Sequence, residues 1–281
     1  MKIGVSSYSF SRLLKQGMSY YEACDQAREM GYAGIEFIDL DLQHGRGEGA
    51  IEELAGKLRA HCEDIGLAIP AYTVGADFLN REGEVARVRG CADIAKVLGA
   101  GVLRHDAFWS MPGLRDWRQA VSRIAPAIRE VAQYAQGLGL RTCTENHGLI
   151  MQDALRVECM INEVNHSNYG WLVDIGNFLC ADEDPAYAVG IAAPYAFHAH
   201  VKDFLVKPGA WDAPQGGWFR SRGGNHLRGT VIGDGAVPVR QCVGILQRAA
   251  YDGWLSVEFE GAEEVLPALT SARKFLAGLG L

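Results

Sequence analysis

The hydrophobic residues of the chain follow two alternating patterns. Short apolar runs are typical of buried parallel strands, and the longer segments between them carry apolar residues every three or four positions, as amphipathic helices do. The short runs predict strands at 2–6, 34–38, 67–73, 101–105, 140–145, 170–174, 196–201 and 254–258. The periodic segments predict helices at 21–30, 50–65, 80–98, 117–138, 153–164, 184–192, 238–250 and 263–276.

Strict alternation of eight strands and eight helices predicts one closed (β/α)₈ barrel, the TIM barrel, which is an α/β fold. With 281 residues, 48% of them hydrophobic, the chain could form such a barrel or two smaller domains. The continuous rhythm favours a single domain over 1–281. The competing fold is a doubly wound open sheet, which needs a glycine-rich phosphate turn after the first strand, and residues 6–10 contain no glycine.

The seventh predicted strand carries a polar residue on every second position. Side chains alternate between the two faces of a strand, so His198, His200 and Lys202 share one face while Ala199 and Val201 share the other. Three polar side chains are therefore expected to point into the barrel. A histidine on a strand is more often a hydrogen-bonded structural residue than a metal ligand, so a metal site needs support from other strands.

Three other predicted strands end in an acid, namely Glu145, Asp174 and Glu258. The active sites of TIM barrels lie at the carboxyl ends of the strands, so we expect these acids to converge on His200. Three buried carboxylates would repel one another and lose their hydration unless a cation held them. The sequence therefore predicts a metal site formed by Glu145, Asp174, His200 and Glu258.

A donor set so rich in oxygen suits Mn²⁺ first, and also Mg²⁺, Co²⁺ or Zn²⁺. A divalent ion that binds a carbonyl and the neighbouring hydroxyl acidifies the C–H between them and stabilises the resulting enediolate. A carboxylate on each side of that carbon could remove and return the proton. This chemistry predicts an isomerase or epimerase of a small sugar, keto-sugar or polyol.

Several short motifs carry a family resemblance. They are Glu145-Asn-His-Gly148, Asp174-Ile-Gly-Asn177, His198-Ala-His-Val-Lys-Asp203, Gly233-Asp-Gly235 and Val257-Glu258, together with the Gly-Ile-Glu36 of the second strand. With these motifs the chain resembles, over essentially its whole length, the xylose-isomerase-like TIM barrel superfamily of sugar (phosphate) isomerases and epimerases. That group also includes ketose 3-epimerases, hydroxypyruvate isomerase and inosose dehydratase.

The resemblance implies that Glu145, Asp174, His200 and Glu258 bind the metal, and that Glu145 and Glu258 double as the catalytic acid/base pair in the epimerase branch of the family. Of the two histidines on the seventh strand, His200 is preferred as the ligand because it lies nearer the carboxyl end. His198 stays an alternative ligand.

A second set of residues is expected to contact the substrate. The resemblance implies this role for His147, Asn177 and His198. His105, at the end of the fourth strand, could line the pocket or cap a helix, and Glu36 could touch the substrate or only anchor the barrel interior. The full set predicted to bind substrate is His147, Asn177, His198, Lys202, His105 and Glu36.

Two other reactions compete with isomerisation on this scaffold. One is a lyase reaction, the dehydration of a keto-inositol or keto-sugar, in which the enediolate expels a β-hydroxyl group. The other is phosphodiester hydrolysis, because an apurinic endonuclease shares the superfamily. Hydrolysis fits less well because it needs a multi-zinc cluster with extra histidines, and residues 71–75 at the end of the third strand contain none.

Composition limits the partners and the cellular compartment expected for this chain. A formal net charge of −7, with lysines and arginines scattered, argues against a nucleic-acid partner. The seven cysteines form no Cys-x-x-Cys pair and are expected to be reduced residues of a cytoplasmic protein. The first residues are interrupted by serines and lack the apolar core of a signal peptide, and no run is long enough to span a bilayer.

The segment 204–235, after the seventh strand, is longer than a usual βα loop. Loops of this length without structure of their own are often functional lids. A lid here would cover the sugar and exclude water, and the alternative is contact with a second copy in a homo-oligomer. The residues that suggest these roles are Trp211, Trp218, Phe219, Arg220, Arg222 and Arg228.

Overall fold

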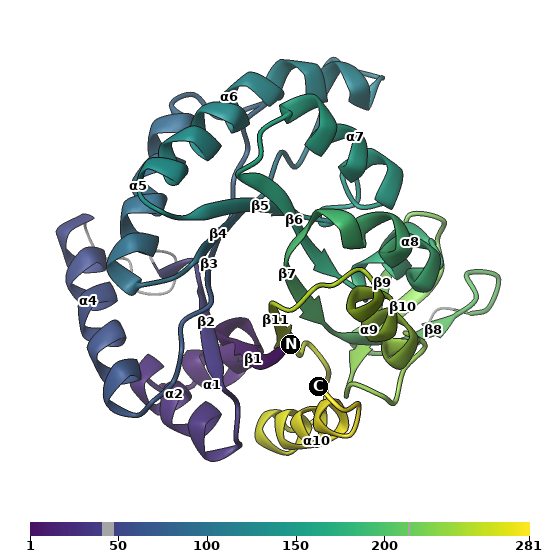
Figure 1. Cartoon of the computed structure of the whole chain (residues 1–281). Coiled ribbons are helices and arrows are strands. Elements are labelled where there is room, and N and C mark those ends of the chain that lie inside the picture. Colours follow the sequence, from purple (N-terminus) through teal and green to yellow (C-terminus); the bar gives the residue numbers. More distant parts are fainter. Residues whose placement is uncertain (41–47, 213) are drawn as a thin grey trace.

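Parallel strands close into a barrel in the computed structural model, which describes residues 1–40, 48–212 and 214–281 (Figure 1). Around the barrel the strand order is β1-β11-β7-β6-β5-β4-β3-β2, so strands that are consecutive in the barrel pair in parallel and the last strand pairs with the first. The predicted TIM barrel is thus confirmed. Its strands are β1 (Lys2–Ser6), β2 (Gly34–Ile38), β3 (Ala71–Val74), β4 (Val102–His105), β5 (Arg141–Glu145), β6 (Tyr169–Asp174), β7 (Ala196–Val201) and β11 (Trp254–Val257).

Helices surround the barrel and bury their apolar faces against it (Figure 1). A capping box starts α2, in which Ser19 and Glu22 each satisfy the backbone N–H of the other. Gly99 ends α5 in the left-handed region, with φ of +75°, which a residue with a Cβ adopts only with strain. The helices are α1 (Ser11–Lys15), α2 (Tyr20–Glu29), α4 (Glu48–Asp64), α5 (Glu84–Leu98), α6 (Trp117–Gly137), α7 (Ala154–Val164), α8 (Pro185–Ala192), α9 (Val239–Arg248) and α10 (Val265–Ala277).

Element boundaries differ most at the starts of the third strand and of the helix after it, where α5 begins at Glu84 instead of residue 80. The sequence predicts a strand from residue 67, whereas β3 begins at Ala71, directly after Pro70. Proline has no backbone N–H to donate, so it suits the position before a strand rather than its centre.

The described helices include none that is long and apolar enough to cross a membrane.

The segment after β7 is a small sheet rather than the long loop expected at 204–235. It contains β8 (Asp203–Lys207), β9 (Phe219–Arg220) and β10 (His226–Thr230), paired antiparallel in the order β8-β10-β9. Phe204 and Leu227 pack with Cys180 under this sheet. The Asp203 carboxylate accepts backbone N–H groups from Gly233, Gly235 and Val237, which fixes the return of the chain to the barrel.

The barrel interior is layered. A small apolar cluster consists of Ala71, Val102, Cys143 and Leu172, with Phe197 packed against it. Side chains on one face of a strand recur every second residue, so the next inward positions of these four strands lie one layer closer to the carboxyl ends. Those positions are Thr73, Arg104, Glu145 and Asp174, all of them polar.

Shortening a side chain on the outward face of β4 tests the packing between the barrel and its helices. Leu103 is fully buried there, and Leu103→Ala is expected to lower the free energy of unfolding by about 2–5 kcal/mol, because it leaves a cavity. Leu155→Ala is the matched control, since Leu155 is 59% exposed and its loss is expected to change stability by no more than about 0.5 kcal/mol. Urea denaturation of the two variants measures the difference, and equal destabilisation would contradict this packing.

Candidate metal centre

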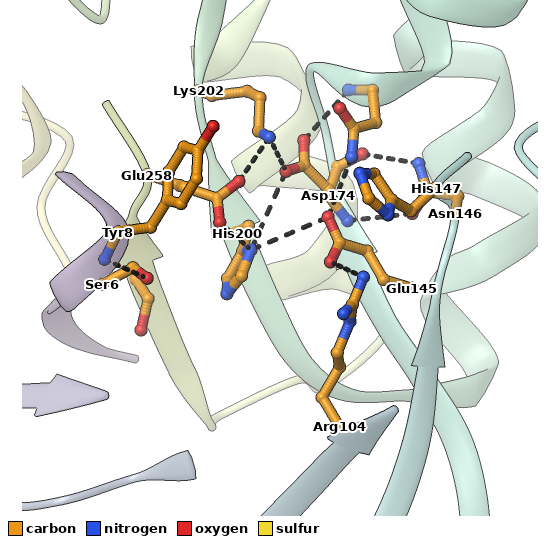
Figure 2. A network of polar contacts seen from close by, with 12 residues as sticks. Ser6, Tyr8, Arg104, Glu145, Asn146, His147, Asp174, His200, Lys202 and Glu258 are labelled. Atoms are coloured by element: carbon orange, nitrogen blue, oxygen red, sulfur yellow. Dashed lines mark hydrogen bonds and ion pairs between the residues drawn. The ribbon is translucent and has the colours of Figure 1, made fainter. Parts of the chain in front are cut away.

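Four side chains meet at the carboxyl ends of the last strands of the barrel. Glu145 ends β5, Asp174 ends β6, His200 lies near the end of β7, and Glu258 directly follows β11. Each offers one ligand atom, and these four atoms lie within 4.8 Å of one another (Figure 2). All four residues are buried. The structure therefore brings the predicted metal-binding residues together.

His200 aims one nitrogen at the three acids. Its Nδ1 lies 3.6 Å from Glu258 Oε1, 3.8 Å from Asp174 Oδ2 and 3.9 Å from Glu145 Oε1. These separations are too long for hydrogen bonds, and within the described part of the chain this buried nitrogen has no hydrogen-bond partner. Its other nitrogen, Nε2, lies 2.6 Å from the Glu36 carboxylate.

Lys202 brings a positive charge into the same site. Its Nζ lies 3.1 Å from Asp174 Oδ2, contacts Glu258 more closely and is 3.8 Å from Glu260. The side chain is almost fully buried. Burial alone would lower the pKa of Lys202, but Asp174 and Glu258 raise it well above its ordinary value. Lys202 therefore stays a cation that partly neutralises the acids.

Arg104 is a site residue that the sequence analysis missed. Its Nη2 lies 2.7 Å from Glu145 Oε2 and 2.7 Å from Asp106 Oδ1. The other Glu145 oxygen accepts a hydrogen bond of 2.8 Å from the Asn177 amide. Both oxygens of Glu145 are therefore engaged by donors. The alternation of β4 could have identified Arg104, because it follows the inward Val102 by two residues.

His105, predicted to bind substrate, does not lie in the site. Alternation along β4 turns it outward, where its ring packs 5.2 Å from Phe78 and 5.8 Å from Tyr169, measured between ring centroids. Its Nδ1 is 2.9 Å from the Asp106 carbonyl oxygen. Burial lowers the pKa of His105 to about 4, so the ring is neutral at physiological pH. This residue belongs to the packing between the barrel and its helices.

Glu36 and His198 were also predicted to contact substrate, and the structure buries both in the barrel interior. Glu36 is fully buried, and its two carboxylate oxygens lie 2.6 Å from His198 Nε2 and 2.6 Å from His200 Nε2. Burial alone would raise the pKa of Glu36, but the two histidines lower it well below its ordinary value. Both oxygens of Glu36 have a histidine partner and the side chain has no exposed surface, so Glu36 anchors the barrel interior. This was the alternative interpretation of Glu36 in the sequence analysis.

A cleft of about 390 Å³ lies next to the four predicted ligands, because two of its lining residues contact them: Lys202 contacts Asp174, and Asn177 contacts Glu145. His147, Asn177 and Lys202, which the sequence predicted to bind substrate, lie on its wall. His147 also contacts Asp106, with its Nδ1 3.3 Å from a carboxylate oxygen. Burial opposes a charge on His147, but the hydrogen bond to Asp106 raises its pKa. Phe219 and Arg220, which the sequence analysis named for a lid in the segment 204–235, also line the cleft, and Trp109 and Glu260 are lining residues that it did not select.

The acids of the site differ in their tendency to hold a proton. Burial raises the pKa of Asp174 to about 6, and repulsion from Glu145 and Glu258 adds to this while Lys202 opposes it. Burial also acts on Glu258, but Lys202 and His200 outweigh it and hold the pKa of Glu258 well below its ordinary value. For His200, Glu36 and Glu258 outweigh burial and raise the pKa. The surroundings of Asp174 and Glu258 therefore shift the pKa values of these two neighbouring carboxylates in opposite directions.

The residues present fit a divalent metal ion. Three carboxylates and an imidazole supply a donor set that suits such ions, and the partnerless Nδ1 of His200 faces the three acids. Glu145, Asp174, His200 and Glu258 would hold the ion. A cation between them would also offset the repulsion that three buried carboxylates exert on one another.

Comparison with known proteins agrees with this fold. The model of the xylose isomerase-like TIM barrel family matches residues 24–278. An inosose dehydratase from Serratia proteamaculans is 26% identical over 200 residues, which cover 66% of this chain and 60% of that protein. The chain therefore spans less than two thirds of the length of that curated relative.

Solved structures extend the likeness over nearly the whole chain. The IOLI protein with a binding zinc atom has a TM-score of 0.77 at 16% identity, covering 99% of this chain and 98% of that one. A xylose isomerase-like TIM barrel protein from Mycobacterium smegmatis in complex with magnesium has a TM-score of 0.72 at 19% identity, covering 99% and 96%. At these identities the likeness concerns the fold.

Removing single ligands tests the metal centre. Asp174→Ala and His200→Ala are each expected to reduce bound metal from about one ion per chain to a small fraction, because each change removes a donor. Elemental analysis after dialysis against Mn²⁺ measures the occupancy. Glu84→Gln is the matched control, because Glu84 is a buried acid outside the site, paired with Arg87. Full occupancy in the two ligand variants would rule the site out.

Metal affinity should depend on pH. The raised pKa values of Asp174 and His200 mean that both groups hold protons in mildly acidic solution, and an ion must displace these protons. Affinity is therefore expected to rise as the pH increases from about 5 to about 8, with net proton release on binding. Calorimetry in buffers of different ionisation enthalpy measures this release. Binding without it would mean that the ion lies elsewhere.

Proposed function

Because the chain belongs to the xylose isomerase-like TIM barrel family, we propose that it is a divalent-metal-dependent enzyme acting on a small polyhydroxylated carbonyl compound. The reaction proposed is the dehydration of a keto-inositol or keto-sugar. The inosose dehydratases among its relatives support this choice over isomerisation.

The observation that carries the proposal is the unequal state of the two catalytic carboxylates. Both oxygens of Glu145 accept hydrogen bonds or ion pairs, from Asn177 and Arg104. An epimerase needs a carboxylate on each side of one carbon, alternating between base and acid. Both oxygens of Glu145 already have a close donor, whereas Glu258 is held by Lys202 at Oε2 and its Oε1 lies 3.6 Å from His200 Nδ1. Dehydration needs only one such base, together with an acid for the departing oxygen.

Glu258 and His147 suit these two roles. Figure 2 shows Glu258 on one side of Asp174 and His147 on the other. Glu258 is ionised, because its pKa is held low by Lys202 and His200 despite burial, so it can accept the proton of the α-carbon. His147 has a raised pKa, because its hydrogen bond to Asp106 outweighs burial, and lies on the cleft wall, so it can donate a proton to the departing hydroxyl.

The proposed step balances as an elimination. Glu258 takes the α-proton, and the electron pair of that C–H bond becomes the new C=C bond. The β C–O bond breaks with its electron pair on oxygen, and the proton from His147 completes a water molecule. A divalent ion held by the four ligands would polarise the substrate carbonyl and so acidify the α C–H.

Isomerisation or epimerisation is the second candidate. The position of Glu145 and Glu258 in one cluster favours it, since their ligand atoms lie within 4.8 Å and both could reach a shared substrate carbon. Both candidates begin with the same proton abstraction. They differ in whether the proton returns or the β-hydroxyl leaves.

Incubation of the Mn²⁺-loaded protein with keto-inositols and ketoses in D₂O separates the two candidates. We expect loss of water from a keto-inositol or keto-sugar, seen as an unsaturated product by mass spectrometry. Deuterium at the α-carbon with the mass otherwise unchanged would favour the epimerase instead.

Glu258→Gln tests the base. The amide keeps the shape of the side chain but cannot accept the proton, so turnover is expected to fall by roughly 10²-fold or more. Glu163→Gln, at an exposed position of α7, is the control and should leave turnover unchanged. Wild-type proton exchange in a Glu258→Gln protein that still holds its metal would remove Glu258 from this role.

Phe219→Ala tests whether the small sheet contributes to the substrate cleft. Phe219 lines the cleft, and loss of its ring is expected to raise KM by about 3- to 10-fold, the size of one aromatic contact. Trp211→Ala is the matched control from the same insertion, because Trp211 is 63% exposed and does not line the cleft. Equal KM values for the two variants would exclude a role for Phe219 in binding.

A further inference from the structure

One buried carboxylate of the barrel interior lies outside the cluster of four predicted ligands. Glu36 projects inward from β2 and has no exposed surface. Its Oε1 lies 2.6 Å from His200 Nε2 and its Oε2 lies 2.6 Å from His198 Nε2, so the carboxylate forks between two histidines of β7. The neighbouring Ile35 and Phe37 point the other way and are fully buried, which holds the strand in this register.

An ionised carboxylate can only accept hydrogen bonds, so each histidine must carry its hydrogen on Nε2. When the imidazole of His200 is neutral, this leaves Nδ1 as the nitrogen with a free lone pair. That nitrogen is the one that faces Glu145, Asp174 and Glu258 and has no hydrogen-bond partner within the residues described. The tautomer that Glu36 selects is therefore the one that can bind a metal ion at the cluster.

The second arm of the fork restrains Glu36 itself. His198 Nε2 lies 2.6 Å from Glu36 Oε2 and 3.2 Å from the Ser256 hydroxyl. A carboxylate bonded at one oxygen could still rotate, whereas two bonds of this length fix the plane of the group. Because the carboxylate plane is fixed, its Oε1 also fixes the orientation of the His200 ring that donates to it.

We propose that Glu36 is a positioning residue of the metal centre, which acts through His200 by fixing its tautomer and ring orientation, with His198 as the second anchor. The inference rests on the metal site in the proposed function and adds residues that bind neither the ion nor the substrate. Outer partners of this kind typically change metal affinity by about 10- to 100-fold. The competing explanation is that Glu36 only neutralises two buried histidines.

Glu36→Gln distinguishes these explanations. The amide keeps the size of the side chain but offers one acceptor and one donor, so it cannot receive N–H groups from both histidines. We expect Co²⁺ to bind about 10- to 100-fold more weakly, with a changed ligand-field spectrum, because His200 no longer presents Nδ1 uniformly. Ser256→Ala is the matched control, since it removes the other contact of His198 and leaves the Glu36–His200 bond in place.

Should Glu36→Gln fail to fold, the wild-type protein supplies the second measurement. In the Zn²⁺-loaded protein with isotope-labelled histidine, nuclear magnetic resonance should show His200 bound to zinc through Nδ1, with a slowly exchanging proton on Nε2. Binding through Nε2, or unchanged Co²⁺ affinity and spectrum in a folded Glu36→Gln protein, would overturn the inference while leaving the metal site intact. Failure of the wild type to bind either ion would instead overturn the metal site and the inference with it.

Discussion

The mutual repulsion of buried carboxylates is the constraint on which this site depends. Glu145, Asp174 and Glu258 offer oxygens within 4.8 Å of one another and of a histidine nitrogen, in the interior of a barrel. Charges removed from water at such separations destabilise the fold unless other charges compensate them. The structure places cations on every side of the acids: Arg104 against Glu145, and Lys202 between Asp174 and Glu258. A divalent ion would complete this compensation at the one point where the acids and His200 Nδ1 converge.

The same compensation differentiates the acids chemically. Lys202 and His200 lie close to Glu258 and keep it ionised. Burial and two acidic neighbours raise the pKa of Asp174, so that Asp174 holds a proton in mildly acidic solution. Glu145 is held at both oxygens by Arg104 and Asn177. Glu258 is held closely at one oxygen only and Glu145 at both, although both are glutamates at the ends of barrel strands. This difference supports the proposed elimination over epimerisation.

The insertion after β7 contributes residues to the wall of the cleft. Its sheet is secured at both ends, by Asp203 at the barrel and by Asp182, whose carboxylate accepts hydrogen bonds from Ser221 and Asn225. Held in this way, the sheet brings Phe219 and Arg220 to the cleft that His147 and Lys202 also line. An aromatic surface and positive charge thus line the same cleft as Lys202, which contacts the acids of the candidate metal centre.

The sequence by itself determined the barrel and the convergence of four polar side chains, because both follow from local periodicity. Alternation with period two and an acid at the end of a strand suffice to place Glu145, Asp174, His200 and Glu258 at one rim once the barrel closes. The tertiary structure decided the rest. Alternation along β4 makes Arg104 and His105 face opposite ways, but which of the two faces inward depends on how β4 pairs with its neighbours. The fork of Glu36 on two histidines spans strands far apart in the chain. The sheet after β7 likewise requires β8 to pair with β10, which follows it after an intervening segment, and such long-range pairing leaves no periodic signal along the sequence.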